Sequence, residues 1–149
     1  MSKFAVNHWY AAAWTGEIGE APFARRILGE PVVFFRQADR RIAALVDRCA
    51  HRLVPLSMGV CVEGRIRCGY HGMEYDGSGK CVRIPAQEII PPKAKTRSFP
   101  VIERYGLVWL WMGEIPIMPI PPSCPRWRGM ARPAGTSSTA VISTIRRTI

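Results

Sequence analysis

Residues 49–72, CAHRLVPLSMGVCVEGRIRCGYHG, begin and end with a short motif that contains one cysteine and one histidine. The motifs are CAHR at 49–52 and CGYHG at 68–72, and 16 residues lie between His51 and Cys68. Thiolates and neutral imidazoles are both good ligands for iron and zinc. Intervals of one and two residues between cysteine and histidine let one short loop supply both ligands. This stretch therefore predicts a metal centre held by two loops.

The ligand types match one kind of iron–sulfur centre. In a Rieske [2Fe–2S] cluster, two thiolates bind one iron and two imidazoles bind the other. The neutral imidazoles replace two negative ligands, which raises the reduction potential relative to an all-cysteine cluster. The second ring nitrogen of each imidazole can exchange a proton or donate a hydrogen bond towards an electron partner. The two motifs therefore favour electron transfer.

The residues around the motifs are typical of short strands joined by tight turns. Polar turns are expected at 37–40 and 76–79, and the first of them joins two β-rich segments into a hairpin. The expected strands are 24–28, 31–36, 41–46, 65–68, 80–84, 96–103 and 107–112. No apolar period of 3.6 residues persists for three turns, so we predict an all-β domain over residues 1–113.

Several stretches recur in the order found in a known family. They are WYAAAW (9–14), LGEPVVFFR (28–36), CAHR (49–52), PLSMG (55–59), YHGMEY (70–75), GKCVRIP (79–85) and YGLVWLW (105–111). Over residues 5–113 the chain resembles the N-terminal Rieske domain of Rieske non-haem iron oxygenases, in particular the vanillate O-demethylase-like oxygenase subunits. The resemblance implies a small antiparallel β-sandwich with a cluster-binding subdomain of two loops.

The resemblance also implies four cluster ligands, namely Cys49, His51, Cys68 and His71. A structural Cys₂His₂ zinc module is the alternative use of the same side chains, but zinc ligand pairs are usually separated by two or more residues. A disulfide is disfavoured, because the chain has an odd number of cysteines and no secretory signal is recognised.

Other residues near the ligands have weaker assignments. Arg52 and Tyr70 lie beside the ligands and are candidates for tuning the cluster by charge or hydrogen bonding, although surface ion pairing or loop packing explains them equally well. Cys61 and Cys81 are expected to be small buried residues, and Cys124 a free thiol.

Composition excludes several classes of protein. The chain has 149 residues and a formal net charge of +10, and no apolar run approaches the roughly 18 residues of a membrane-spanning helix. Within residues 1–113 basic residues occur singly or in pairs without interleaved aromatics, so we expect no nucleic-acid partner. With no secretory signal recognised, we expect a cytoplasmic protein without a membrane partner.

The composition changes after residue 113. Residues 114–149 contain six Pro, five Arg, one acidic residue and no sustained period, so we expect an irregular tail. Our hypothesis for this tail is premature termination or a frame change near Gly113. In the family, a larger C-terminal domain holds a mononuclear iron with two histidines and one carboxylate. Two of the three histidines here are assigned to the cluster, so we expect no mononuclear Fe(II) site and no catalytic residue in this chain.

These expectations leave two redox functions open. The first is the electron-transfer domain of an aromatic-compound oxygenase, an oxidoreductase component that is not catalytically complete alone. The second is a stand-alone Rieske ferredoxin. The resemblance implies a reductase with flavin and an iron–sulfur centre as electron donor, and oxygenase subunits, a trimer in the family, as partners.

Overall fold

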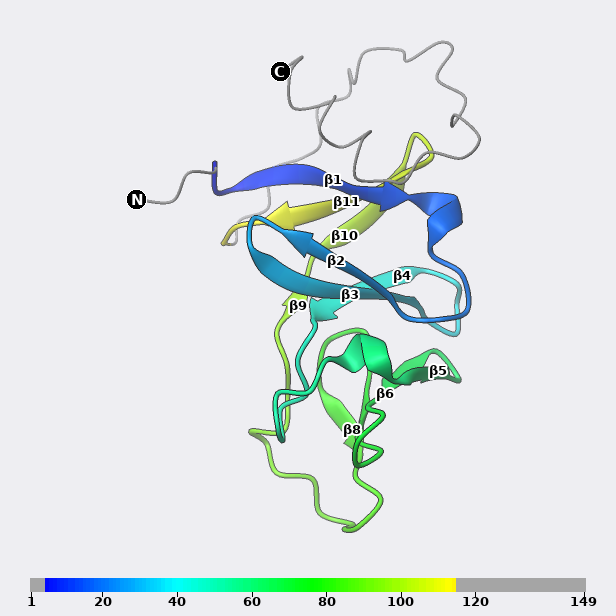
Figure 1. The fold of residues 1–149 in the computed structure, drawn as a ribbon, viewed down its shortest axis with the longest axis vertical. Coiled ribbons are helices and arrows are strands. Elements are labelled where there is room, and N and C mark those ends of the chain that lie inside the picture. The colour runs from blue at the N-terminus through cyan, green and yellow to red at the C-terminus, as the bar shows by residue number, and fades with distance from the viewer. Residues whose placement is uncertain (1–4, 115–149) are drawn as a thin grey trace.

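The computed structural model describes residues 5–114, which form three antiparallel sheets (Figure 1). The first has the order β1 (His8–Trp14), β11 (Leu107–Met112), β10 (Val101–Arg104). The second has the order β2 (Phe23–Ile27), β3 (Glu30–Arg36), β4 (Ile42–Val46), β9 (Ser98–Phe99). The third has the order β5 (Val60–Val62), β6 (Arg65–Arg67), β7 (Glu74–Tyr75), β8 (Cys81–Arg83). Two 3₁₀ turns, η1 (Thr15–Glu17) and η2 (Leu56–Met58), lie between strands.

The second sheet lies between the other two (Figure 1), and its central strands β3 and β4 are buried on both faces. Alternate residues of β3 point to opposite faces of the sheet. Val32 and Phe34 join a core with residues of the first sheet, whereas Val33 and Phe35 join a core with residues of the third. All four side chains are completely buried, which explains the uninterrupted apolar run in β3.

The predicted all-β fold is confirmed, and so is the hairpin, which β3 and β4 form. The single strand expected over residues 96–103 is wrong. Pro100 separates β9 from β10, and the two pair in different sheets because proline has no N–H to continue a ladder. No helix within residues 5–114 has the length and apolar character needed to cross a bilayer. Apart from Glu114, the tail lies outside the described residues.

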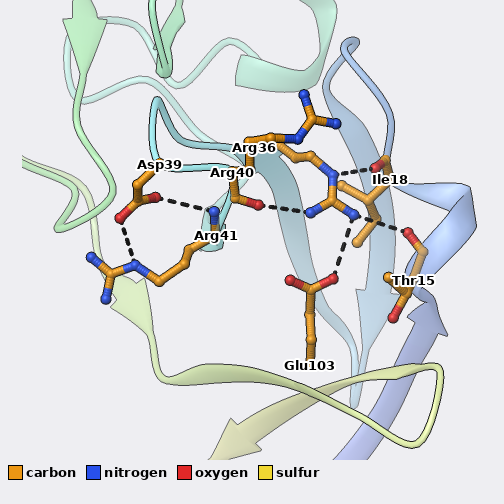
Figure 2. Close-up of polar contacts among 7 residues, drawn as sticks. All are labelled: Thr15, Ile18, Arg36, Asp39, Arg40, Arg41 and Glu103. Carbon is orange, nitrogen blue, oxygen red and sulfur yellow. Dashed lines mark hydrogen bonds and ion pairs between the residues drawn. The ribbon is translucent and has the colours of Figure 1, made fainter.

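Arg36, at the end of β3, links the first and second sheets (Figure 2). Its guanidinium donates hydrogen bonds to three backbone carbonyls, those of Ile18 at 2.9 Å, Arg40 at 2.8 Å and Thr15 at 3.2 Å. It also lies 3.4 Å from the Glu103 carboxylate of β10. The side chain is only 17% exposed, so water competes weakly for these acceptors.

We expect Arg36→Met to lower the free energy of unfolding by about 1–3 kcal/mol, because the variant keeps the apolar stem and leaves the part-buried carbonyls of Ile18 and Thr15 without their donor. Urea unfolding measures the change. Arg41→Met is the matched control, since Arg41 is 80% exposed and its one ion pair within residues 5–114 is with Asp39 on the surface. Its effect should stay below about 0.5 kcal/mol. Equal effects of the two substitutions would contradict this role for Arg36.

Candidate metal centre

The two cysteine–histidine motifs form loops of the same backbone shape. In each loop, the cysteine N–H bonds to the carbonyl five residues later, and the cysteine carbonyl accepts from the N–H four residues later. The bonds join Cys49 to Val54 at 2.8 Å and to Leu53 at 2.9 Å, and Cys68 to Met73 at 2.8 Å and to Gly72 at 3.1 Å. The first loop follows β4 and the second joins β6 to β7. Each loop is therefore closed by its own backbone.

This shape requires a left-handed residue at the fifth position of each loop. Leu53 has φ 58° and Gly72 has φ 73°. A Cβ on residue 72 would also lie 3.0 Å from Cγ of Pro85, so glycine is needed there for space as well as for conformation. The glycine that ends the CGYHG motif is explained by these two constraints.

The space between the loops is set by two further contacts. Asp47, just before the first loop, accepts hydrogen bonds from the Ser57 N–H at 2.7 Å and the Ser57 hydroxyl at 2.6 Å, which fixes η2 against this loop. Beyond η2, the backbone at Gly59 lies against β6, since a Cβ there would come within 1.9 Å of the Arg67 carbonyl oxygen. The chain that joins the two loops therefore also braces them.

The two cysteines meet in the interior. Cys49 and Cys68 are 3% and 2% exposed, neither is in a disulfide, and the two thiols interact. Burial raises the pKa of Cys68 above its ordinary value, although hydrogen bonds from the backbone N–H groups of Tyr70 and His71 favour the thiolate. Those same N–H groups are ready donors to a sulfur that becomes negative when it binds a metal.

The two histidines meet at the surface. Nδ1 of His51 lies 3.1 Å from Nδ1 of His71, and both rings are exposed. The ring of Tyr70 stacks on His71 with centroids 3.8 Å apart. Two imidazole nitrogens on one metal, each about 2.0–2.1 Å from it, lie roughly 3.0–3.4 Å apart. The histidine pair therefore has the separation that a shared metal ion requires.

The four side chains form two pairs, one of sulfur and one of nitrogen. Across residues 5–114, no group of three or more His, Cys, Asp or Glu side chains is placed to hold one metal ion. A binuclear centre with two sulfur ligands on one metal and two nitrogen ligands on the other fits this arrangement. A structural zinc ion would need all four on one metal.

Tyr75, on β7, contacts Cys49 of the cysteine pair and was not singled out from the sequence. Its hydroxyl lies 3.2 Å from Sγ of Cys49 and accepts a hydrogen bond from the Ala50 N–H at 3.1 Å. Burial, followed by the contact with Cys49, raises the pKa of Tyr75, so the hydroxyl keeps its proton and can donate it to a thiolate. The side chain of Tyr75 points inward because β7 pairs with β6. A strand as short as β7 shows no periodic pattern in the sequence from which this could be predicted.

The other residues singled out from the sequence have no proposed ligand role. Arg52 is exposed, and within residues 5–114 it has no ion pair. Cys81 is buried as expected, whereas Cys61 is only half-buried. Cys124 lies outside the described residues.

A buried carboxylate joins three strands of the third sheet. Glu74 of β7 is 3% exposed, and its oxygens lie 2.8 Å from Arg67, 2.9 Å from Arg83 and 3.5 Å from Arg65. Burial by itself raises the pKa of Glu74, but hydrogen bonds from Arg83 and Arg67 and their charges outweigh it and leave the pKa below its ordinary value. The carboxylate thus ties β6 and β8 to β7, which follows the second loop.

Comparison with known proteins adds to this geometry. The family model described as Rieske [2Fe–2S] domain matches residues 8–100. The putative toluene-4-sulfonate monooxygenase system iron-sulfur subunit of Comamonas testosteroni is 51% identical over 108 residues, 72% of this chain and 31% of that protein. The vanillate O-demethylase oxygenase subunit of a Pseudomonas species is 40% identical over 111 residues, 74% of this chain and 31% of that protein. A crystal structure of dicamba monooxygenase with non-heme iron and dicamba matches with a TM-score of 0.75 at 44% identity, covering 79% of this chain and 37% of that chain.

These matches cover most of this chain and a minor part of each relative. The chain spans about a third of the length of the curated relatives it matches.

We expect Glu74→Gln to lower the free energy of unfolding by about 1–3 kcal/mol near neutral pH, because it removes the charge that faces three arginines. The lowered pKa makes this stabilisation fully present above the ordinary value of 4.5 and lost as the pH falls through the folded-state pKa. Urea unfolding of variant and wild type at about pH 7 and about pH 3 should show the difference shrinking in acid. The exposed Glu88→Gln serves as control and should change stability little at either pH. A difference that grows in acid would contradict the assignment.

Proposed function

Because the chain belongs to the Rieske [2Fe–2S] domain family, we propose that it binds such a cluster and transfers single electrons through it. The resemblance of its motifs to Rieske oxygenase subunits is confirmed by the relatives it matches. The proposed ligands are Cys49 and Cys68 for one iron and His51 and His71 for the other. The observation that carries this proposal is the 3.1 Å separation of the two histidine Nδ1 atoms beside a buried pair of free thiols.

When bound, the cluster supplies a one-electron couple, and the protein sets how easily it is reduced. Burial of the cysteine pair excludes water from the sulfur side. The Tyr75 hydroxyl and the N–H groups of Tyr70 and His71 place hydrogen-bond donors at the sulfurs, where negative charge increases on reduction. The exposed histidine rings offer a short path to a partner at the surface.

We further propose that the chain is the electron-transfer part of an oxygenase that acts on aromatic compounds, in the cytoplasm. Relatives named as an iron-sulfur subunit of a monooxygenase system and as an oxygenase subunit support this assignment. A flavin and iron–sulfur reductase would supply the electrons. Residues 1–149 contain one histidine besides the proposed ligands, so these residues do not themselves supply two histidines for a mononuclear iron.

Cluster binding is tested by expressing the chain with iron and sulfide and recording electron paramagnetic resonance after dithionite reduction. We expect visible absorption and a Rieske-type signal of low average g. Cys68→Ser should abolish both, because one sulfur ligand is lost. Cys61→Ser, a half-buried cysteine with no proposed ligand role, is the matched control and should keep both. Folded, colourless protein that binds zinc would refute the proposal, as would equal loss in the two variants.

Tyr75→Phe should lower the reduction potential of the cluster by about 40 mV. The hydroxyl's hydrogen bond to Cys49 favours the more negative reduced state, and about 1 kcal/mol corresponds to this shift for one electron. Protein-film voltammetry measures the potential. Tyr70→Phe keeps the ring that stacks on His71 and should shift the potential much less. A larger shift for Tyr70→Phe would instead assign the tuning role to Tyr70.

A further inference from the structure

Three of the four lysines in the sequence lie close together in the third sheet region. Lys80 precedes β8, and Lys93 and Lys95 lie on the segment that leads to β9, followed by Arg97. All four residues are exposed, whereas Ala94 and Thr96, which alternate with Lys93, Lys95 and Arg97, are half-buried. We call Lys80, Lys93, Lys95 and Arg97 the basic edge.

Two lysines of the basic edge face each other directly. Lys80 and Lys95 form an antiparallel bridge whose flanking backbone hydrogen bonds enclose the pair. Those bonds run from Cys81 N–H to Ala94 O at 2.9 Å and from Thr96 N–H to Gly79 O at 2.8 Å. This is the close, non-hydrogen-bonded type of pair, with Cα atoms about 4.5 Å apart. Like charges directly opposite one another destabilise a sheet, so this pair does not serve stability.

The ion pairs of the described chain do not include the basic edge. Every ion pair within residues 5–114 uses an arginine, and none involves a residue of the basic edge. Arg97 instead lies over the ring of Phe99, with Cζ 4.9 Å from the ring centroid. Nearby, the Asp76 carboxylate accepts N–H groups of its own turn. The basic edge thus presents four positive charges to solvent.

The basic edge adjoins the cysteine side of the proposed metal centre. Ala94, between two of its lysines, packs against the core that contains Cys49 and Cys68, and its carbonyl accepts the N–H of Cys81. Cys81 is buried in the same core and interacts electrostatically with Cys49. The segment between Lys80 and Lys93 also covers the second loop, since Pro85 limits the space at Gly72.

We infer that the basic edge is the docking surface for the acidic face of an iron–sulfur electron-donor protein. This inference rests on the proposed function and adds the surface to it. In the complex, the donor loses one electron and is oxidised, the cluster gains that electron and is reduced, and no bond forms or breaks. The electron would enter from the cysteine side, which leaves the exposed histidine rings for the acceptor.

Lysine suits a transient complex of this kind. Its ammonium group is a compact, strongly hydrated point charge on a flexible stem. Such charges at the rim of an interface steer encounter and raise association rates without forming a long-lived contact. Electron-transfer encounters also bury little surface, so a patch of four cations is of suitable size.

The test uses the full chain loaded with its cluster and a reduced, acidic plant-type [2Fe–2S] ferredoxin, whose potential near −400 mV is low enough to reduce a Rieske centre. Stopped-flow absorbance gives the second-order rate constant, and calorimetry of the oxidised partners gives the Kd. At low ionic strength, Lys93→Glu/Lys95→Glu should lower the rate constant and weaken binding about 10-fold or more. The wild-type rate should fall with added salt, and the variant's rate should depend on salt much less.

Arg26→Glu/Arg104→Glu is the matched control, because it changes net charge equally at exposed residues of β2 and β10 in the other two sheets. It should stay within about 2-fold of wild type. Dithionite reduction at equal rates in all three proteins would show that each holds an intact cluster. Absence of a reducible cluster in the wild type would refute the proposed function itself.

Equal slowing in both double variants, or none in either, would overturn the docking surface while leaving the cluster assignment in place. The inference would also be wrong if the lysine variant lost binding to phosphatidylserine vesicles or duplex DNA but kept its rate with ferredoxin. In that case the basic edge would serve another anionic partner.

Discussion

Each ligand loop is closed by two backbone hydrogen bonds on its own cysteine, and the chemistry proposed for this chain depends on that closure. In each loop, the backbone N–H of the cysteine donates a hydrogen bond and its backbone carbonyl accepts one. These bonds fix the positions from which the thiol and the imidazole of the loop project. Because the loops share one shape, bringing them face to face pairs sulfur with sulfur and nitrogen with nitrogen. The third sheet and the Asp47–Ser57 contact hold that arrangement.

Local signals in the sequence were sufficient for the fold class, and they led to the four ligands proposed for the centre. The apolar run of β3, the polar turn after it and the two short motifs each predict their own structure without long-range information. Tyr75 and Glu74 were missed because their roles arise only when strands of two or three residues pair, and such strands show no period. The residues on either side of Pro100 likewise read as one strand in the sequence, because only the pairing of β9 and β10 in different sheets separates them.

Charge is used in two different ways in the described chain. Some arginines donate to backbone and carboxylate acceptors, as Arg36 does to three carbonyls and as three others do to Glu74. Within residues 5–114 the lysines form no ion pair and lie at one edge, two of them directly opposite each other. The formal charge of +10 is therefore a poor guide to function as a sum, and the local distribution is more informative.

The most direct measurement of the central claim is pulsed electron paramagnetic resonance of the reduced chain, which detects nitrogen nuclei bound to the reduced iron. Two imidazole nitrogens, from His51 and His71, should couple to the electron spin, because their Nδ1 atoms are already at the spacing of a shared metal. A reduced centre with no strongly coupled nitrogen would contradict the assignment, since neither histidine would then be bound to the reduced iron.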